Sequence, residues 1–266
     1  MIKKCYLDTS NKADCVGCEA CVQVCAKSAI SMFEDEEGFR YPVIDESKCV
    51  ECGLCRAKCP MNAHLDRYTD DKLAFGGYHR DDVVREQSTS GGAFSAIIES
   101  WCDTNYVIFG AESTGLTVSH SYVTDKREIR KFRKSKYAQS QIGTAYKEAK
   151  SFLKEGKHVV FSGTPCQIAG LKTYLGEIPC DRLLTIEVVC EGIPSPLYIR
   201  KLNKHLADKY GGTIEHLDYR YKDGKRWDFE VMLASITSKS HKYRTFRCDR
   251  WFNPFWSIWL NHLMSR

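Results

Sequence analysis

Eight of the fourteen cysteines occur in two copies of one spacing, C-x2-C-x2-C-x3-C. The first copy comprises Cys15, Cys18, Cys21 and Cys25, and the second comprises Cys49, Cys52, Cys55 and Cys59. Thiolates at this spacing bind the irons of a [4Fe–4S] cubane. Three closely spaced thiolates wrap three corners of the cubane, but the tight loop cannot bring its own fourth cysteine to the last corner. The doubled run therefore predicts two clusters, each completed by a cysteine from the other run.

The doubled run resembles that of bacterial ferredoxins, where the fourth cysteine of each run binds the other cluster. This resemblance assigns one cluster to Cys15, Cys18, Cys21 and Cys59, and the other to Cys49, Cys52, Cys55 and Cys25. Pro60 follows the second run, whereas Ala26 follows the first; a proline there shapes the turn and is not a ligand. Two alternatives carry less weight, because a disulfide framework requires a secreted chain and tetrahedral zinc usually takes ligand pairs separated by longer gaps.

Length and composition indicate an ordered protein of 266 residues, 43% hydrophobic and 27% charged, with room for one small and one large domain. The N-terminus has no apolar signal segment, and no stretch is long enough to span a membrane, so we expect a cytoplasmic protein. The formal charge of +5 is offset by two anionic clusters, so nucleic-acid binding is not predicted. The basic stretch Lys126–Lys136 is either a patch for an anionic partner or, more commonly, a solvated face.

The predicted fold class is α+β: a small dicluster ferredoxin-like domain at residues 1–66, then a mixed α/β flavin-binding domain at 73–266. In the first domain, residues 29–33 and 39–44 read as a hairpin turning at 36–38, and residues 64–72 read as a linker. In the second, the predicted strands are 73–78, 106–111, 158–161 and 183–189, with two more within 214–233. The predicted helices are 93–102, 142–153 and 196–206.

Two segments of the larger domain could form a ligand site. Residues 88–94, STSGGAF, place hydroxyls and two glycines at a helix start, which suits a phosphate or a simple capped turn equally well. In residues 159–167, VVFSGTPCQ, a buried strand ends at a turn and Pro165 opens a helix. Cys166 then lies at a helix N-terminus, a position that lowers a thiol pKa. Cys190 ends the next strand, so both cysteines are predicted at the carboxyl edge of the sheet, where ligands bind.

Through these motifs the chain resembles the coenzyme F420 hydrogenase/dehydrogenase beta-subunit family along nearly its whole length. The segments that carry the likeness are the doubled cysteine run, STSGGAFSAI at 88–97, SKYAQS at 135–140, VVFSGTPCQIAGLKTYL at 159–175 and VVCEGIPSPLYIRK at 188–201. The chain departs from the family pattern at two places. Glu191 stands where members commonly have histidine, and the C-terminal end differs. Members usually continue into a segment with further cysteines, so the chain is expected to be incomplete there, beyond its tryptophan-rich residues 251–259.

The resemblance implies an iron–sulfur flavoprotein oxidoreductase, in which two [4Fe–4S] clusters exchange electrons with FAD. The flavin then exchanges a hydride with an organic partner, such as a deazaflavin or another substrate connected with polysaccharide biosynthesis, and a protein donor or acceptor serves the clusters. The expected flavin contacts are Ser88, Ser90, Gly91, Gly92, Lys136, Ser140, Gly163 and Thr164. Cys166 and Cys190 are candidate catalytic residues, which would either bind a third cluster or form a reactive thiol pair. The alternative is that they are two unconnected buried thiols. Alternatives are a non-catalytic electron-transfer subunit that docks a partner oxidoreductase, and a structural iron–sulfur module.

Overall fold

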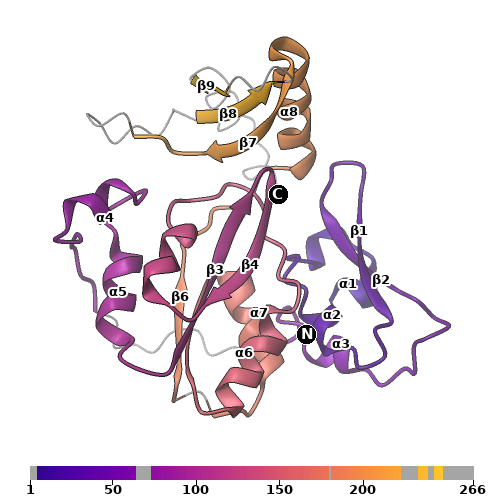
Figure 1. Ribbon diagram of the computed structural model, residues 1–266. Helices are drawn as coiled ribbons and strands as arrows, with labels where there is room; N and C mark the ends of the chain where they lie inside the picture. Colours follow the sequence, from indigo (N-terminus) through magenta and orange to yellow (C-terminus); the bar gives the residue numbers. More distant parts are fainter. Residues whose placement is uncertain (1–4, 64–72, 180, 223–232, 239–242, 248–266) are drawn as a thin grey trace.

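The computed structural model of the chain describes residues 5–63, 73–179, 181–222, 233–238 and 243–247. Figure 1 shows three parts: an N-terminal module, a central sheet flanked by helices, and a further sheet covered by one helix. The N-terminal module lies against the central part on the side that carries α6 and α7. The cysteine-bearing module therefore has an extensive contact with the larger domain.

The N-terminal module is built around the antiparallel hairpin of β1 (Ile30–Glu34) and β2 (Arg40–Ile44), as predicted. Asp35 stabilises its turn, because its carboxylate accepts the backbone N–H groups of Glu37 and Phe39 at 3.0 and 2.9 Å. The short helices around the hairpin are α1 (Tyr6–Thr9), η1 (Lys12–Asp14), α2 (Ala20–Val24) and α3 (Leu54–Ala57). Since α2 and α3 each begin two residues after the second cysteine of a run, the sequence repeat is also a structural repeat.

The central sheet has the strand order β4-β3-β5-β6. β3 (Tyr106–Thr114), β5 (His158–Gly163) and β6 (Leu183–Glu187) are parallel, while β4 (Thr117–Val123) forms an antiparallel hairpin with β3. The helices are α5 (Ala93–Trp101) and α6 (Ala145–Lys154), which lead into β3 and β5, and α7 (Pro165–Leu175), which follows β5. Because each helix connects to a parallel strand, all three helix N-termini lie at the carboxyl edge of the sheet.

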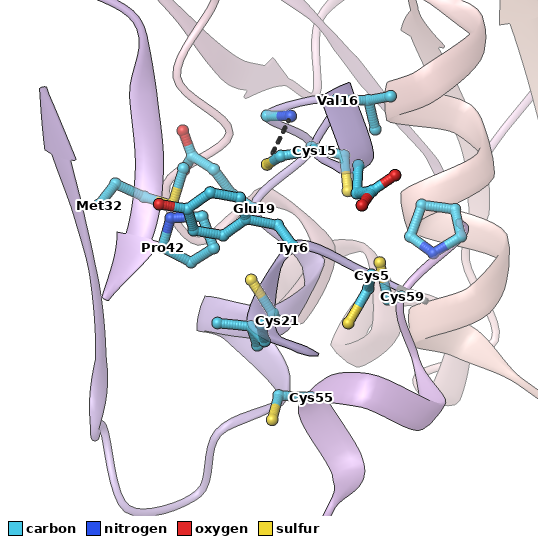
Figure 2. A pocket seen from close by; sticks show the side chains of 15 residues that line it. Cys5, Tyr6, Cys15, Val16, Glu19, Cys21, Met32, Pro42, Cys55 and Cys59 are labelled. Atoms are coloured by element: carbon cyan, nitrogen blue, oxygen red, sulfur yellow. Dashed lines mark hydrogen bonds between the residues drawn. The ribbon is translucent and has the colours of Figure 1, made fainter. Parts of the chain in front are cut away.

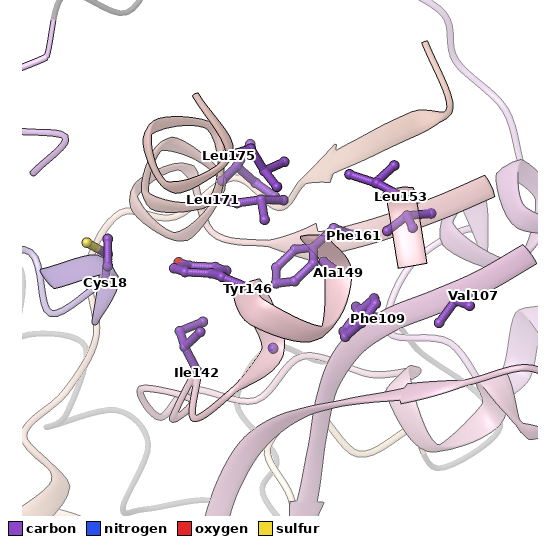
Figure 3. Close-up of a cluster of buried hydrophobic side chains, with 14 residues drawn as sticks. Cys18, Val107, Phe109, Ile142, Tyr146, Ala149, Leu153, Phe161, Leu171 and Leu175 are labelled. Atoms are coloured by element: carbon purple, nitrogen blue, oxygen red, sulfur yellow. The ribbon is translucent and has the colours of Figure 1, made fainter. Parts of the chain in front are cut away.

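Two apolar layers cover the central sheet. On one face, Phe109 and Phe161 pack against α6 and α7, and Cys18 and Ala20 of the N-terminal module belong to the same cluster (Figure 3). On the other face, Ile98 of α5 and Phe132 pack against Ile108 and Val160 of the sheet. The N-terminal module thus contributes directly to one of the two apolar layers that cover the central sheet.

The third part consists of α8 (Pro196–Tyr210) and the antiparallel sheet β7 (Gly212–Asp218), β8 (Leu233–Ser238) and β9 (Tyr243–Arg247). α8 begins with Ser195 as N-cap, whose hydroxyl accepts the N–H of Leu197 at 3.2 Å. The helix buries Ile199, Leu202 and Leu206 against this sheet. Their spacing of three to four residues places them on one face of the helix.

Some of the predicted elements require correction. Residues 73–78 form no strand: Leu73, Phe75 and Tyr78 are exposed, and no neighbouring strand is available for pairing in the described chain. The sheet instead gains β4, and residues 82–86 and 126–132 form α4 (Asp82–Glu86) and η2 (Lys126–Phe132), all absent from the sequence prediction. The linker 64–72, Cys180, Cys248 and residues 251–259 lie outside the described residues.

η2 explains the basic stretch that begins at Lys126. Its apolar residues Ile129 and Phe132 are buried against the sheet, while Arg130 and Lys131 lie on the outer side as exposed or partly exposed residues. The stretch is therefore amphipathic. This arrangement agrees with the interpretation as a solvated face better than with a continuous basic patch.

Candidate functional site

Five of the eight cysteines of the two runs line one cavity of the N-terminal module (Figure 2). Its sulfur-bearing lining residues include Cys5, Cys15, Cys18, Cys21, Cys55 and Cys59. Among the described residues, no three His, Cys, Asp or Glu side chains are gathered closely enough to hold a single metal ion. A cubane differs from a single ion because its four irons spread their ligands over the corners of a cube. A cavity lined by thiols from two loops suits such a cluster.

The backbone of the two runs has the same local geometry at equivalent positions. Gly17 and Glu51, each two residues after the first cysteine of its run, have φ of +63° and +52°. Their N–H groups donate to Cys15 Sγ and Cys49 Sγ, both at 3.4 Å. Left-handed residues bend the loop tightly, which lets closely spaced thiolates point to one side. Hydrogen bonds to the sulfurs stabilise thiolate charge and influence the potential of a cluster.

Cys59 of the second run lies with the first three cysteines of the first run. Burial raises the pKa of the Cys15, Cys18 and Cys21 thiols, and the nearby charge of Cys59 raises each of them further. For Cys18 the result is a pKa of about 12. Cys15, Cys18, Cys21 and Cys59 thus line one cavity, but Cys55 of the other predicted set lines it too, so the assignment of Cys59 to this cluster stays a prediction.

The second predicted ligand set is less compact in the structure. Cys52 is exposed, and its charge acts on Cys55, where burial is the main cause of a raised pKa. Cys25 accepts the N–H of Ala29 through its sulfur at 3.3 Å. Within the described ranges nothing joins Cys25 to Cys49 directly, so the membership of Cys25 in this set stays a prediction.

Two side chains of the N-terminal module fix its contact with the larger domain. Glu19 is buried and forms an ion pair with Arg40, and its second oxygen accepts the N–H of Gly143 at 3.1 Å. Gln23 Oε1 accepts the N–H groups of Tyr146 and Lys147 at 3.0 and 3.2 Å. These interactions satisfy backbone donors at the N-terminus of α6, where Thr144 provides no side-chain cap. Sequence reasoning missed Glu19 and Gln23, since nothing in their spacing distinguishes them from exposed polar residues.

Cys166 and Cys190 both lie at the carboxyl edge of the central sheet. Cys166 is the second residue of α7, with Sγ 3.2 Å from Thr164 Oγ1, and Cys190 is exposed in the segment after β6. Burial raises the pKa of Cys166, and the charge of Cys190 adds to the effect. The expectation that the helix N-terminus lowers the pKa of Cys166 is therefore wrong, because burial dominates. Their joint redox role stays a prediction.

A network of hydrogen-bonded polar side chains lies beside these cysteines. His120 Nε2 lies 3.0 Å from the Ser162 carbonyl oxygen and must donate to it, because a carbonyl oxygen only accepts. In the neutral ring Nδ1 is then the acceptor, and it accepts the Ser140 hydroxyl at 3.0 Å. Gln167 Nε2 donates to Ser140 Oγ at 2.8 Å, and Gln167 Oε1 accepts the N–H of Thr164 at 3.0 Å. Burial lowers the pKa of His120 to about 4. Ser140 and Gln167 occur in the quoted sequence segments, whereas His120 had no sequence signal.

The expected flavin contacts are distributed over several environments. Ser88 Oγ donates to the Val84 carbonyl at 2.7 Å, and Lys136 Nζ donates to the carbonyls of residues 131–133 at 2.8–3.3 Å. A Cβ on Gly91 would lie 2.9 Å from the Gly77 carbonyl oxygen, and one on Gly92 would lie 2.9 Å from His79 Cβ. Close packing thus accounts for both glycines. The donors of Ser88 and Lys136, and the Ser140 hydroxyl described above, already have partners within the chain.

The remaining expected contacts are Ser90, Gly163 and Thr164. Ser90 is exposed next to the N-terminus of α5, and Gly163 and Thr164 join β5 to α7. Thr89 Oγ1 accepts the N–H of Ser135 at 2.7 Å, which brings the segments 88–97 and 135–140 together. At the N-terminus of α7 the Thr164 N–H is likewise engaged, by Gln167 Oε1, and Pro165 has no N–H to offer.

Comparisons with known proteins match two segments of the chain. Residues 14–63 match the profile of the 4Fe-4S dicluster domain, and residues 156–253 match that of the C terminus of the coenzyme F420 hydrogenase/dehydrogenase beta subunit. The chain is 34% identical over 62 residues to an uncharacterised ferredoxin of Methanocaldococcus jannaschii, covering 23% of this chain and 79% of the ferredoxin. It is 37% identical over 79 residues to NADH-quinone oxidoreductase subunit I 2 of Geobacter metallireducens, covering 28% of this chain and 58% of that protein.

A solved structure of the F420-reducing [NiFe] hydrogenase complex from Methanosarcina barkeri contains a similar chain, with a TM-score of 0.41 and 15% identity. The similarity covers 64% of this chain and 58% of that one, so the chain spans less than two thirds of the hydrogenase chain and of the Geobacter protein. None of the helices in the described ranges is long and apolar enough to cross a membrane. The chain is an iron–sulfur electron-transfer protein with a 4Fe–4S dicluster domain, and its residues 156–253 are related to the C terminus of the coenzyme F420 hydrogenase/dehydrogenase beta subunit.

Proposed function

We propose that the chain is a cytoplasmic oxidoreductase component in which two [4Fe–4S] clusters exchange single electrons with FAD at the carboxyl edge of the central sheet. The observation that carries this proposal is the packing of Cys18, which lines the cysteine cavity, against Gly170 of α7, whose N-terminus lies at that edge. Cysteine-rich cluster proteins suit the reducing cytoplasm. A protein partner would supply or remove the electrons, and an organic partner would exchange the hydride.

The residues proposed to hold the flavin are Gly163 and Thr164, with the helix N-terminus that follows them. Because Gln167 accepts the Thr164 N–H and Pro165 has none, this position offers a phosphate group the Cys166 N–H and the helix dipole. When bound, a flavin takes up electrons singly and releases them as a pair with a proton, which the clusters alone cannot do. The protein's contribution is to hold the neutral His120 beside this edge and to keep the path from the cluster to the edge inside the core.

A non-catalytic electron-transfer subunit is the second candidate, and one observation favours it. The donors of Ser88, Lys136 and Ser140 are engaged within the protein, and Gly91 and Gly92 are explained by packing. Fewer of the expected flavin contacts are therefore available than the family resemblance implies. In this alternative the larger domain docks the partner oxidoreductase and binds no flavin.

Quantitation of iron, acid-labile sulfide and flavin in anaerobically purified protein separates the two candidates. The first predicts two clusters and about one FAD per chain, released by acid with yellow fluorescence. Two clusters with no bound flavin, after supplementation with FAD during purification, would leave the electron-transfer subunit as the function. The Thr164→Val variant, which removes a hydroxyl without adding bulk, should retain its clusters and lose flavin; Ser113→Ala, which removes an outlying hydroxyl of β3, is the control.

A further inference from the structure

We infer that the two clusters occupy different places on the electron path. The cluster of Cys15, Cys18, Cys21 and Cys59, here called the inner cluster, couples to the larger domain through Cys18 and α7. The cluster of Cys25, Cys49, Cys52 and Cys55, here called the outer cluster, exchanges electrons with the external protein partner. This inference deepens the proposed function and rests on its electron transfer between clusters and larger domain, but it does not depend on the identity of the cofactor there.

The inner cluster is coupled through a ligand that belongs to the core of the larger domain. Cys18 is only 7% exposed and lies in the apolar cluster with Tyr146, Ile168 and Leu171 (Figure 3). Water is thereby excluded from this side of the cluster. A thiolate ligand in such surroundings provides a short, protein-filled connection between the iron and the helix packed against it.

Gly170 of α7 allows that close approach. A Cβ at this position would lie 3.2 Å from Cys18 Sγ and 2.8 Å from Tyr146 Oη. Tyr146 cannot move away freely, because its hydroxyl donates to the Gln167 carbonyl at 2.8 Å. Glycine is the one residue that leaves room for the helix backbone to touch both the cluster ligand and the tyrosine.

Cys166 lies on the same face of α7 as Gly170, since residues four apart are neighbours on a helix surface. One helical turn, about 6 Å, separates the two positions along the axis. Cys166 is next to Thr164, and Thr164 is at the carboxyl edge of the sheet. The route from the inner cluster to this edge therefore follows one turn of α7, from Gly170 to Cys166.

The second cysteine run, which supplies most ligands of the outer cluster, is exposed to solvent at its second cysteine, where the first run is buried. Cys52 is exposed, and the neighbouring Val50 and Leu54 are 59% and 44% exposed. Apolar side chains around an exposed cluster ligand suit the desolvated centre of a transient electron-transfer contact. The partner expected at this face is a redox protein, because a cluster ligand at the surface shortens the distance for an electron to cross between proteins.

The first test compares the solvent access of the two clusters by electron paramagnetic resonance. Cys21→Ser removes an inner ligand and Cys52→Ser an outer one, so each reduced variant retains one intact cluster, identified by an iron content of about four atoms per chain. A water-soluble gadolinium chelate then relaxes clusters near the surface. We expect several-fold faster relaxation of the signal in Cys21→Ser and little change in Cys52→Ser. Equal relaxation of the two signals, or the reverse order, would overturn the inference.

The second test addresses the contact with α7. Gly170→Ala should shift the g-values and the midpoint potential of the inner cluster and leave the outer cluster unchanged. Gly53→Asn is the matched control in the second run, because no atom lies within 4 Å of a Cβ there and asparagine tolerates its φ of +72°. An unchanged inner signal in folded Gly170→Ala would refute the coupling through α7. Neither test measures flavin. If the protein bound no flavin, the proposed flavin chemistry would be refuted, but the results of these two tests would still decide the inference about the clusters.

Discussion

Gln23 of the cysteine-bearing module accepts the backbone N–H of Tyr146 at 3.0 Å, a hydrogen bond between residues 123 positions apart. The same oxygen accepts the N–H of Lys147, so a side chain of the dicluster module acts as the cap of helix α6 in the larger domain. Uncapped helix N-termini leave N–H groups without partners, which is costly when they are buried. The helix that supports the central sheet therefore depends on the cluster module for its first turn.

Removal of this cap should destabilise the whole chain. Gln23→Ala leaves the buried N–H of Tyr146 and the part-buried N–H of Lys147 without an acceptor, so we expect a loss of about 1–3 kcal/mol in the free energy of unfolding. Urea denaturation followed by circular dichroism measures it. Gln87→Ala is the control, because Gln87 is exposed and its partner Arg133 also bonds Ser95. Equal stability of the two variants would show that Gln23 does not act as a cap.

The ion pair between Glu19 and Arg40 should be sensitive to the loss of either partner. Glu19 is 6% exposed, so Arg40→Leu leaves a buried carboxylate without its countercharge and should cost about 3 kcal/mol. Glu19→Gln in the same chain removes that charge and should recover part of the loss. A double-mutant cycle by urea denaturation provides the coupling energy. Strict additivity of the two changes would contradict a direct interaction.

The buried neutral His120 should make stability fall in mild acid. Burial lowers the pKa of His120 to about 4 in the folded chain, and the charge of Lys136 contributes, whereas the unfolded chain has the ordinary value near 6.5. Between these values the unfolded state binds more protons, so stability is lost as pH falls from 6.5 towards 4, by on the order of 3 kcal/mol.

His120→Gln removes the titrating ring from the same network. The difference in unfolding free energy between the native chain and this variant should narrow as pH falls through that window. Because both proteins hold the same clusters, acid lability of the iron–sulfur centres cancels in the comparison. A difference that is constant from about pH 7 to about pH 5 would contradict the assigned neutral state.

The two cysteines at the sheet edge should differ in reactivity. Cys190 is exposed, while burial raises the pKa of Cys166 and keeps it as a thiol at neutral pH. Because the thiolate is the reactive form, iodoacetamide should modify Cys190 many times faster than Cys166. Mass spectrometry of peptides after timed labelling measures both rates. Faster modification of Cys166 would show that it is activated, as the helix position alone had suggested.

Local sequence signals predicted much of the fold. The spacing of Phe94, Ile98 and Trp101 marked α5, and the apolar run 158–161 marked β5, because burial of a helix face or a central strand leaves a periodic pattern. The prediction of a strand at residues 73–78 was wrong. A strand must pair with a neighbouring strand, and the apolar pattern of a segment does not show whether such a strand is present. β4 was missed because polar residues such as His120 and Ser121 interrupt the apolar alternation.

The candidate site was predictable to the extent that it depends on spacing. The spacing of the cysteine runs alone indicates cluster binding. Cys59 lines the same cavity as Cys15, Cys18 and Cys21, but so does Cys55 of the other set, and the crossed ligation stays a prediction. The contact between module and domain was not predictable, because Glu19, Gln23 and Gly170 acquire their roles only when segments more than 120 residues apart meet. The same holds for Gly91 and Gly92, whose apparent phosphate signature is explained by packing on residues 77–79.

The central claim is that two [4Fe–4S] clusters are held by ligands crossed between the runs, with Cys59 completing the inner one. The most direct test is the Cys59→Ser variant, purified anaerobically and characterised by iron analysis and by the electron paramagnetic resonance of the reduced protein. We expect loss or alteration of the inner-cluster signal, the one that survives in Cys52→Ser, and an intact outer-cluster signal, the one that survives in Cys21→Ser. Damage to the latter signal instead would place Cys59 on the cluster of its own run and contradict the crossing.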